Sequence, residues 1–187
     1  MVVFYNTAIF YIELFFMFIV IKNMQTLGKE KIMKKIILTM TLMLVGLTSF
    51  AANNSNEALK FIQSYINAAN TYSTTLPTYY SPNAKIIRVV EKTNGGTASV
   101  VTGMDEYTKQ LKLGAVGAKV TKYKNYYTNL KVTPLANGYK VSGLRQPSGE
   151  SYRLPVYFIV QKNKNGKWQI VEESMNTKVQ KFLKYAK

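Results

Sequence analysis

Three turn signals divide the C-terminal two thirds of the chain into short β-rich runs. Asn94-Gly95-Gly96, Asn137-Gly138 and Asn165-Gly166 each separate two segments rich in branched and aromatic residues. An Asn-Gly pair favours a tight hairpin turn because both residues readily adopt positive φ. The pattern therefore predicts a series of antiparallel hairpins. We expect strands at residues 85–91, 97–102, 119–135, 139–144, 152–161 and 168–173.

Helical periodicity lies mainly outside these runs. Residues 57–72 place apolar side chains at the spacing of one helix face. Residues 76–80 predict a short second helix or turn, and residues 105–113 a third helix. Residues 177–187 predict a short basic amphipathic helix. Helices followed by a run of antiparallel strands predict an α+β fold in a single domain.

The first fifty residues are typical of an export signal. Met33-Lys34-Lys35 supplies a charged start, and residues 36–47 form an apolar run. Ser49 and Ala51 then place small side chains where signal peptidase requires them. The run is shorter than the roughly twenty apolar residues that a membrane span needs. We therefore expect a Sec signal peptide at residues 33–51, cleavage after Ala51, and a mature protein in the periplasm or outside the cell.

The residues before Met33 allow two interpretations. Residues 2–21 form a second apolar stretch, interrupted by Glu13, that is long enough to span a membrane. We favour a translation start at Met33, because residues 28–31 can be encoded by a purine-rich string that resembles a ribosome-binding site. The predicted organisation is upstream mistranslated sequence at 1–32, a signal peptide at 33–51, one domain at 52–176 and a C-terminal helix at 177–187.

Composition removes several kinds of chemistry. The chain has no cysteine and no histidine, so thiol nucleophiles, disulfides, imidazole bases and the commonest metal ligands are missing. We expect no metal and no cofactor. The net charge of +16, from 25 Lys and Arg against 9 Asp and Glu, favours anionic partners such as lipid headgroups or cell-wall polymers. A lysine-rich composition is also what an AT-rich genome produces, and this is the simpler interpretation.

Four segments resemble one known superfamily in their order and spacing. Residues 61–70 (FIQSYINAAN) resemble its first helix, and residues 76–87 (LPTYYSPNAKII) the passage from its second helix into its first strand. Residues 102–107 (TGMDEY) resemble the glycine before its third helix, and residues 165–170 (NGKWQI) the turn and tryptophan of its last hairpin. The order is similar to that of the nuclear-transport-factor-2-like superfamily, which includes SnoaL-like polyketide cyclases and ketosteroid isomerases.

The resemblance implies a cone-shaped fold. A strongly bent antiparallel sheet is expected to wrap around the N-terminal helices, with an apolar pocket at the open end and Trp168 in the core. The isomerases carry a carboxylate base on the first strand, and the matching residue here is Arg88, which cannot abstract a proton at neutral pH. Other branches use a histidine–aspartate pair, and this chain has no histidine. We therefore expect binding rather than catalysis.

Arg88 is the most informative candidate for a pocket residue. It shares one strand face with Ile86 and Val90, and the resemblance directs this face into the cone. A buried guanidinium needs a partner. Arg88 could hold the carboxylate or phosphate of a ligand, or pair with Glu172 or Glu173 on the last strand, and we favour the pairing. The candidate ligand-binding residues are Tyr65, Arg88, Tyr157 and Glu173.

Three functional interpretations stay open at this point. The favoured one is an exported, non-catalytic domain that binds a small amphipathic or anionic ligand or a partner protein. The second is an isomerase, cyclase or dehydratase with an unfamiliar tyrosine, glutamate or arginine site. The third is a cationic envelope protein that associates weakly with an anionic membrane or cell wall. A homodimer through the sheet is compatible with the fold, and no nucleic-acid motif is present, so we expect no nucleic-acid partner.

Export by this route predicts that the mature protein begins at Ala52. N-terminal sequencing of the exported protein measures this directly. Recovery of any peptide from residues 1–32 in the mature protein would contradict both the cleavage position and the start at Met33.

Overall fold

The computed structural model describes residues 35–36, 39 and 54–185. The chain divides into two compact units, residues 1–53 and 54–187, and the strands of the described residues belong to the second unit. The predicted upstream segment at 1–32 lies outside the described residues. The predicted signal peptide at 33–51 also lies outside them, apart from Lys35, Ile36 and Thr39.

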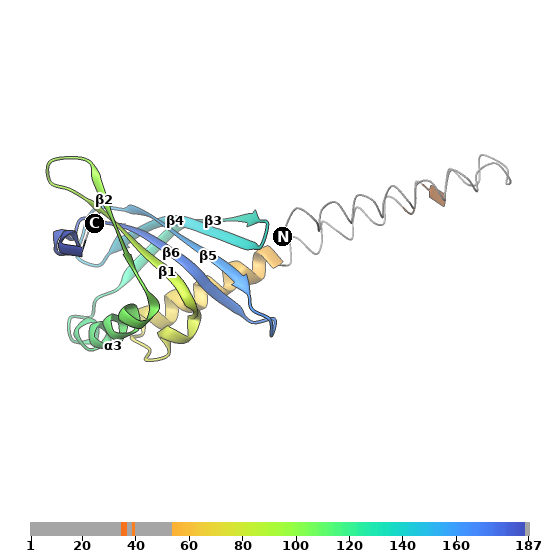
Figure 1. Cartoon of the computed structure of the whole chain (residues 1–187), viewed down its shortest axis with the longest axis horizontal. Coiled ribbons are helices and arrows are strands. Elements are labelled where there is room, and N and C mark those ends of the chain that lie inside the picture. The colour runs from red at the N-terminus through yellow and green to blue at the C-terminus, as the bar shows by residue number, and fades with distance from the viewer. Residues whose placement is uncertain (1–34, 37–38, 40–53, 186–187) are drawn as a thin grey trace. The chain divides into compact units, whose positions relative to one another are not determined.

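The second unit consists of a bent sheet with helices packed on one face (Figure 1). It begins with a helix at residues 54–70. The other elements follow in chain order: η1 (Leu76–Tyr79), β1 (Tyr80–Glu91), β2 (Thr97–Thr102), α3 (Met104–Val120), β3 (Asn125–Leu135), β4 (Gly138–Pro147), β5 (Leu154–Lys162), β6 (Trp168–Thr177) and η2 (Gln180–Tyr185).

The six strands form one sheet in the order β2-β1-β6-β5-β4-β3. The hairpin pairs are antiparallel, whereas β1 and β6, which are far apart in the sequence, run parallel. The meander from β3 to β6 ends beside β1, which already carries β2 on its other edge. The sheet is therefore mixed rather than wholly antiparallel. The predicted α+β class, with a bent sheet around the N-terminal helices, is confirmed.

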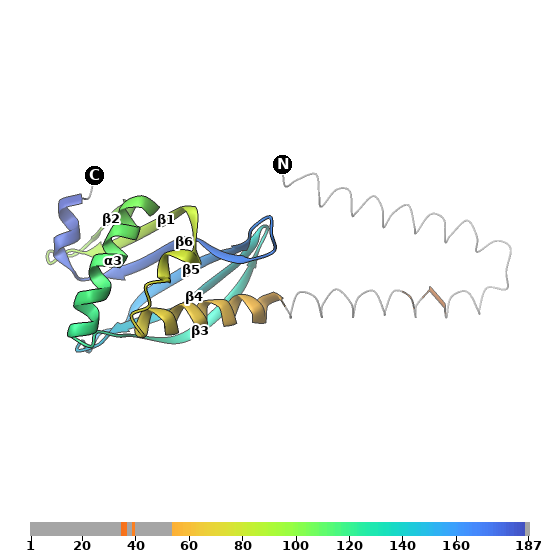
Figure 2. The ribbon, with the colours of Figure 1, turned by 90° about the horizontal axis from the view of Figure 1, so that it is seen from below.

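The core lies between the helix at residues 54–70 and the sheet (Figure 2). Ala58, Ile62 and Tyr65 form one face of this helix and are buried against the sheet, where Phe158 and Ile170 are fully buried. Removing aliphatic or aromatic side chains of this size from water stabilises the fold by about 1.5–3 kcal/mol each. This packing fixes the helix on the sheet and carries the Tyr65 ring to 5.5 Å from the Phe158 ring.

A bulge in β6 decides which side chains of this strand face the core. Ile170 and Glu172 oppose consecutive residues of β5, so Val171 is an extra, unpaired residue. An extra residue shifts the inward–outward alternation by one position. Ile170 and Glu173 are consequently both fully buried, although their odd spacing would place them on opposite faces of a regular strand.

Several boundaries differ from the predictions. Strand β1 begins at Tyr80 instead of residue 85, and β4 extends to Pro147 instead of residue 144. The strand predicted at 119–135 begins only at Asn125, because α3 continues to Val120. Lys122 then adopts a left-handed backbone (φ 52°), and the Tyr123 N–H donates to the Ala118 carbonyl at 2.9 Å. This pattern is a common helix stop. At the other end β6 runs to Thr177, and the predicted C-terminal helix is a 3-10 helix confined to η2.

Trp168 was expected in the core, but it is half-buried at the margin of the core. Its indole N–H donates to Glu57 Oε2 at 3.3 Å, and its ring lies 5.9 Å from the Tyr139 ring. A tryptophan with a hydrogen-bonded N–H commonly occupies such a boundary, because the ring prefers burial and the N–H requires an acceptor.

A substitution at Gly138 tests the geometry of the predicted Asn-Gly hairpin turn. Its φ is +125°, and a Cβ at this position would lie 2.1 Å from the Val160 carbonyl oxygen. We expect Gly138→Ala to lower the free energy of unfolding by more than about 2 kcal/mol, since strained backbone and overpacking each cost about 1–3 kcal/mol. Urea denaturation measures this. Gly103→Ala is the control, because its φ is −76° and nothing lies within 4 Å of the new Cβ; equal losses in both variants would contradict the expectation.

Candidate functional site

The centre of the interior is an ion pair between adjacent strands. Arg88 on β1 and Glu173 on β6 come together because these strands pair in parallel, with Ile86 opposite Glu173. Arg88 Nη2 lies 2.7 Å from Glu173 Oε1. The Glu173 side chain is completely buried and the Arg88 side chain is 11% exposed. The predicted pairing of Arg88 with an acid of the last strand is confirmed, and the acid is Glu173.

Tyrosine hydroxyls satisfy the other side of the carboxylate. Tyr80 donates a short hydrogen bond to Glu173 Oε2, and Tyr65 lies 3.2 Å from the same atom. The two hydroxyls are 2.7 Å apart. Arg88 Nη2 also donates to the Tyr107 hydroxyl at 3.2 Å. The helix at 54–70, the start of β1 and α3 each contribute one of these rings, so the cluster ties three elements to the ion pair.

Glu173 Oε1 has a less regular environment than Oε2. It lies at ion-pair distance from Arg88 Nη2, but it accepts no hydrogen bond of good angle. The contact is therefore mainly electrostatic. A fully buried carboxylate oxygen without a second donor makes the positive charge of Arg88 essential to its burial.

The electrostatics keep the three tyrosines and Arg88 of this cluster in one ionic form. Burial, reinforced by the negative charge of Glu173, raises the pKa of Tyr65, Tyr80 and Tyr107 above the ordinary tyrosine range. Burial, the largest single influence, would lower the pKa of Arg88, but the Glu173 carboxylate and the three neighbouring tyrosines together outweigh it, and the pKa is raised. The tyrosines therefore stay protonated hydrogen-bond donors and the arginine stays charged. None of them is poised to exchange a proton near neutral pH.

The structure brings together three of the four predicted pocket residues. Tyr65, Arg88 and Glu173 are in direct contact, but they contact one another rather than lining an open pocket. Tyr157 is not with them. It precedes the buried Phe158 on β5 and therefore faces the other side of the sheet, where its hydroxyl donates to Glu172 Oε1 at 2.8 Å.

Two members of the cluster were not among the pocket residues predicted from the sequence. Tyr80 and Tyr107 hold the carboxylate and the guanidinium respectively. Tyr107 carried a usable signal, since it lies on the apolar face of the predicted third helix. Tyr80 did not, because its orientation depends on η1 and on the irregular pairing of β1 with β6 between Tyr80 and Lys85.

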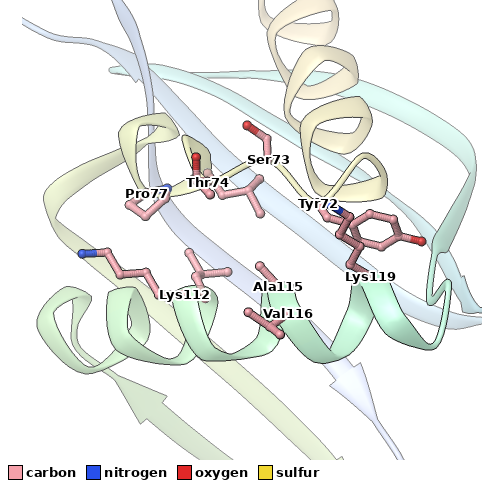
Figure 3. Close-up of a pocket in the computed structure, with 10 residues that line it drawn as sticks. Tyr72, Ser73, Thr74, Pro77, Lys112, Ala115, Val116 and Lys119 are labelled. Atoms are coloured by element: carbon pink, nitrogen blue, oxygen red, sulfur yellow. The ribbon is translucent and has the colours of Figure 1, made fainter.

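An open groove lies outside this cluster, between the loop before η1 and α3. Its volume is about 290 Å³. Figure 3 shows the loop and the helix on opposite sides of the hollow, with their side chains turned toward each other. The lining is mostly apolar or aromatic, with two lysines from α3. The lining residues are Tyr72, Ser73, Thr74, Leu76, Pro77, Leu111, Lys112, Ala115, Val116 and Lys119.

The part of α3 that borders the groove is unusually apolar on its solvent side. Leu113, Val116 and Val120 are 77%, 69% and 79% exposed, and their spacing places them on one face of the helix. Exposed apolar side chains that are grouped in this way are more informative than single ones. The groove and this face together form the most apolar accessible part of α3.

Two other kinds of site are not found among the described residues. No group of three or more acidic side chains there could hold a metal ion. None of the helices in the described ranges is both long enough and apolar enough to cross a membrane.

Comparisons with known proteins bear on the fold. No protein-family model matches the sequence, and no curated protein matches it significantly. A protein of unknown function from Pseudomonas putida KT2440, described as nuclear-transport-factor-2-like, is 13% identical with a TM-score of 0.53, over 67% of this chain and 87% of that chain. This chain has the nuclear-transport-factor-2-like fold. The predicted resemblance is thus confirmed for the fold.

Two further structures show how widely proteins of this fold vary. One is a nuclear-transport-factor-2-like protein with a cystatin-like fold from Novosphingobium aromaticivorans, 11% identical, with a TM-score of 0.55 over 72% of this chain and 88% of its own. The other is a putative dehydratase from Streptomyces avermitilis, 11% identical, with a TM-score of 0.50 over 66% of this chain and 96% of its own. The fold by itself therefore assigns no function.

The ion pair predicts a large effect of removing one partner. Arg88→Met strands the buried Glu173 carboxylate and should lower the free energy of unfolding by about 3–5 kcal/mol. Lys162→Met is the control, because the Lys162–Glu57 pair has the similar length of 2.8 Å but is about 40% exposed, and such pairs contribute at most about 1 kcal/mol. Denaturant titration measures both. The double variant Arg88→Met/Glu173→Gln should recover part of the lost free energy of unfolding, because it no longer buries a charge alone. A loss under about 1 kcal/mol in Arg88→Met would show that the pair is not structural.

Proposed function

We propose that this protein is an exported, non-catalytic domain of the nuclear-transport-factor-2-like fold that binds a small amphipathic anion. The groove between residues 72–77 and α3 is the observation that carries this proposal. The apolar part of the ligand would lie against Leu76, Pro77 and Ala115, and its anionic head would meet Lys112 and Lys119.

The size and lining of the groove support a small ligand. A volume of about 290 Å³ is near the lower end of the range for small-molecule pockets, which are usually about 300–1,000 Å³. Such pockets are mostly apolar, with a few polar groups that fix orientation. Lysine suits an anionic head because its ammonium acts as a flexible point charge on an apolar stem.

The state of Glu173 supports binding over catalysis. A general acid or base must reach a substrate within hydrogen-bond distance and exchange a proton near the working pH. Glu173 is instead enclosed by Arg88, Tyr65 and Tyr80, and no part of it is accessible. It is the only fully buried acid among the described residues, and its position favours a structural role.

Export is supported by the sequence of residues 33–51. Residues 119–127, where lysines and tyrosines alternate, belong to the end of α3, a turn and the first residues of β3.

The homodimer through the sheet and the lack of a nucleic-acid partner stay predictions.

Titration with a fluorescent medium-chain fatty acid, displaced by unlabelled laurate, tests the proposal. We expect saturable binding, with dodecanol a weaker competitor because it lacks the charge. The double variant Lys112→Glu/Lys119→Glu should weaken binding by about tenfold or more, the equivalent of about 1.4 kcal/mol. Ala115→Trp should abolish binding by filling the groove.

The double variant Lys164→Glu/Lys167→Glu is the matched control, since it makes the same charge change at two exposed lysines of the β5–β6 turn that do not line the groove. This turn lies beside the start of the helix at residues 54–70, where Lys162 binds Glu57, whereas the groove begins beyond the end of that helix, about 25 Å further along. The control variant should bind laurate within about twofold of the wild type, because exposed charges separated by more than a Debye length are largely screened. Binding that survives Ala115→Trp, or that falls equally in the control variant, would argue against the groove.

The exposed face of α3 favours a second candidate function, association with an anionic membrane surface. Leu113, Val116 and Val120 could enter the headgroup region while Lys112 and Lys119 contact lipid phosphates. This candidate differs from the first in its test. Binding to vesicles containing phosphatidylglycerol should fall with added salt and with Val120→Asp, a residue outside the groove, while laurate binding is retained.

A further inference from the structure

A second buried arginine lies on β4, and within residues 54–185 no carboxylate pairs with it. Arg145 is only 5% exposed. Its Nη1 donates to Asn125 Oδ1 at 2.7 Å and to the Tyr123 hydroxyl at 3.4 Å, and its Nη2 donates to the Asn176 carbonyl at 3.3 Å. All three acceptors are neutral, and the buried Nε–H has no acceptor.

This environment leaves the charge of Arg145 uncompensated. A guanidinium has five N–H donors, and two of the five are unused here. Burying an unpaired charge costs several kcal/mol, so buried arginines are normally paired with an acid. Arg88 follows this rule through Glu173 at 2.7 Å, whereas Arg145 does not.

Two tyrosines and a lysine lie near Arg145. Tyr123, whose hydroxyl makes the longest of the three contacts, is 38% exposed and stands at the surface. Tyr152 is close enough that the charge of Arg145 tends to lower its pKa, against a net rise caused mainly by burial. The Nζ of Lys178 lies 4.8 Å from the centre of the Tyr152 ring.

Two acids lie in the same region without neutralising the arginine. Glu150 and Glu91 also influence the ionisation of Tyr152. Neither forms an ion pair with Arg145, and within the described ranges the pairs that do form are Arg88–Glu173 and Lys162–Glu57. The Arg145 end of the sheet thus combines two cations, two tyrosine rings and unused guanidinium donors.

We propose that Arg145 binds the carboxylate of a small aromatic acid. A carboxylate has two coplanar oxygens that match two neighbouring guanidinium N–H groups, which a single-point anion does not. The carboxylate accepts from the Nε–H and from the unused Nη2–H, reaches them past the partly exposed Tyr123, and supplies the missing negative charge. The ring of the ligand stacks beside Tyr123 or Tyr152, and Lys178 adds a second positive charge. The groove shares none of these residues, so this site does not depend on the proposed function.

Benzoate is the probe, with benzamide as its neutral analogue and inorganic phosphate as an anion without an aromatic ring, all at constant ionic strength. The ¹⁵N–¹H spectrum of the full chain after signal removal reports the Arg145 Nε–H directly. We expect benzoate to shift this resonance saturably and to raise the melting temperature. Benzamide should bind at least about tenfold more weakly because it lacks the charge, and phosphate at least about tenfold more weakly because it has no ring to stack beside a tyrosine.

Variants separate binding from a purely structural arginine. Arg145→Lys keeps the charge but loses the planar fork, and should weaken benzoate binding by about tenfold or more. Lys178→Met should weaken binding without affecting the fold, and Lys181→Met is its control on the same C-terminal segment. If Arg145→Lys does not fold, the wild-type spectrum and the Lys178→Met variant still test whether benzoate binds at Arg145. The proposal fails if benzoate does not shift the Nε–H, if benzamide or phosphate binds as tightly, or if Lys178→Met has no effect.

Discussion

The ion pair between Arg88 and Glu173 is the constraint around which the interior is arranged. It joins β1 and β6, whose parallel pairing connects the β1–β2 hairpin to the meander that begins at β3. Tyr65, Tyr80 and Tyr107 extend the cluster to the helix at residues 54–70, to the start of β1 and to α3. A buried pair of this kind contributes less to stability than its Coulomb energy suggests, because both charges have lost their water. Its stronger effect is on specificity: an arrangement that separates the two side chains would leave a charge buried alone.

The same cluster decides where ligands can bind. In a cone-shaped fold the space between helices and sheet is the obvious pocket, but here the central part of it is occupied by side chains that satisfy one another. Glu173, Tyr65 and Tyr80 are all buried, and burial together with the Glu173 charge holds the tyrosines in the protonated form. The accessible groove consequently lies outside this centre, against α3. The uncompensated guanidinium of Arg145 is buried near the end of β4 rather than at its centre.

Arg88 and Arg145 illustrate how context separates two chemically identical side chains. Both are buried on strands of one sheet, yet one faces a carboxylate and the other faces an amide oxygen, a phenol and a backbone carbonyl. The first arrangement is complete without a ligand, because charge and hydrogen bonds are matched. The second is hydrogen-bonded but electrically unbalanced. A guanidinium left in this state is a stronger candidate for ligand recognition than one already paired, even though the paired one occupies the centre of the fold.

The sequence by itself determined the local features, because these depend on neighbouring residues. The glycine turns, the helix at residues 54–70, strand β2 and the inward face shared by Ile86, Arg88 and Val90 all follow from short-range patterns. It also predicted that Arg88 would meet an acid of the last strand, but not which one. Only the tertiary structure decided that, since the bulge at Val171 turns Glu173 rather than Glu172 inward. The position of Tyr157 on the opposite face, the extension of α3 to Val120 and the unpaired charge of Arg145 were likewise settled by strand register and packing between distant segments. No local pattern encodes these, because each depends on which residues the fold brings together across the sheet.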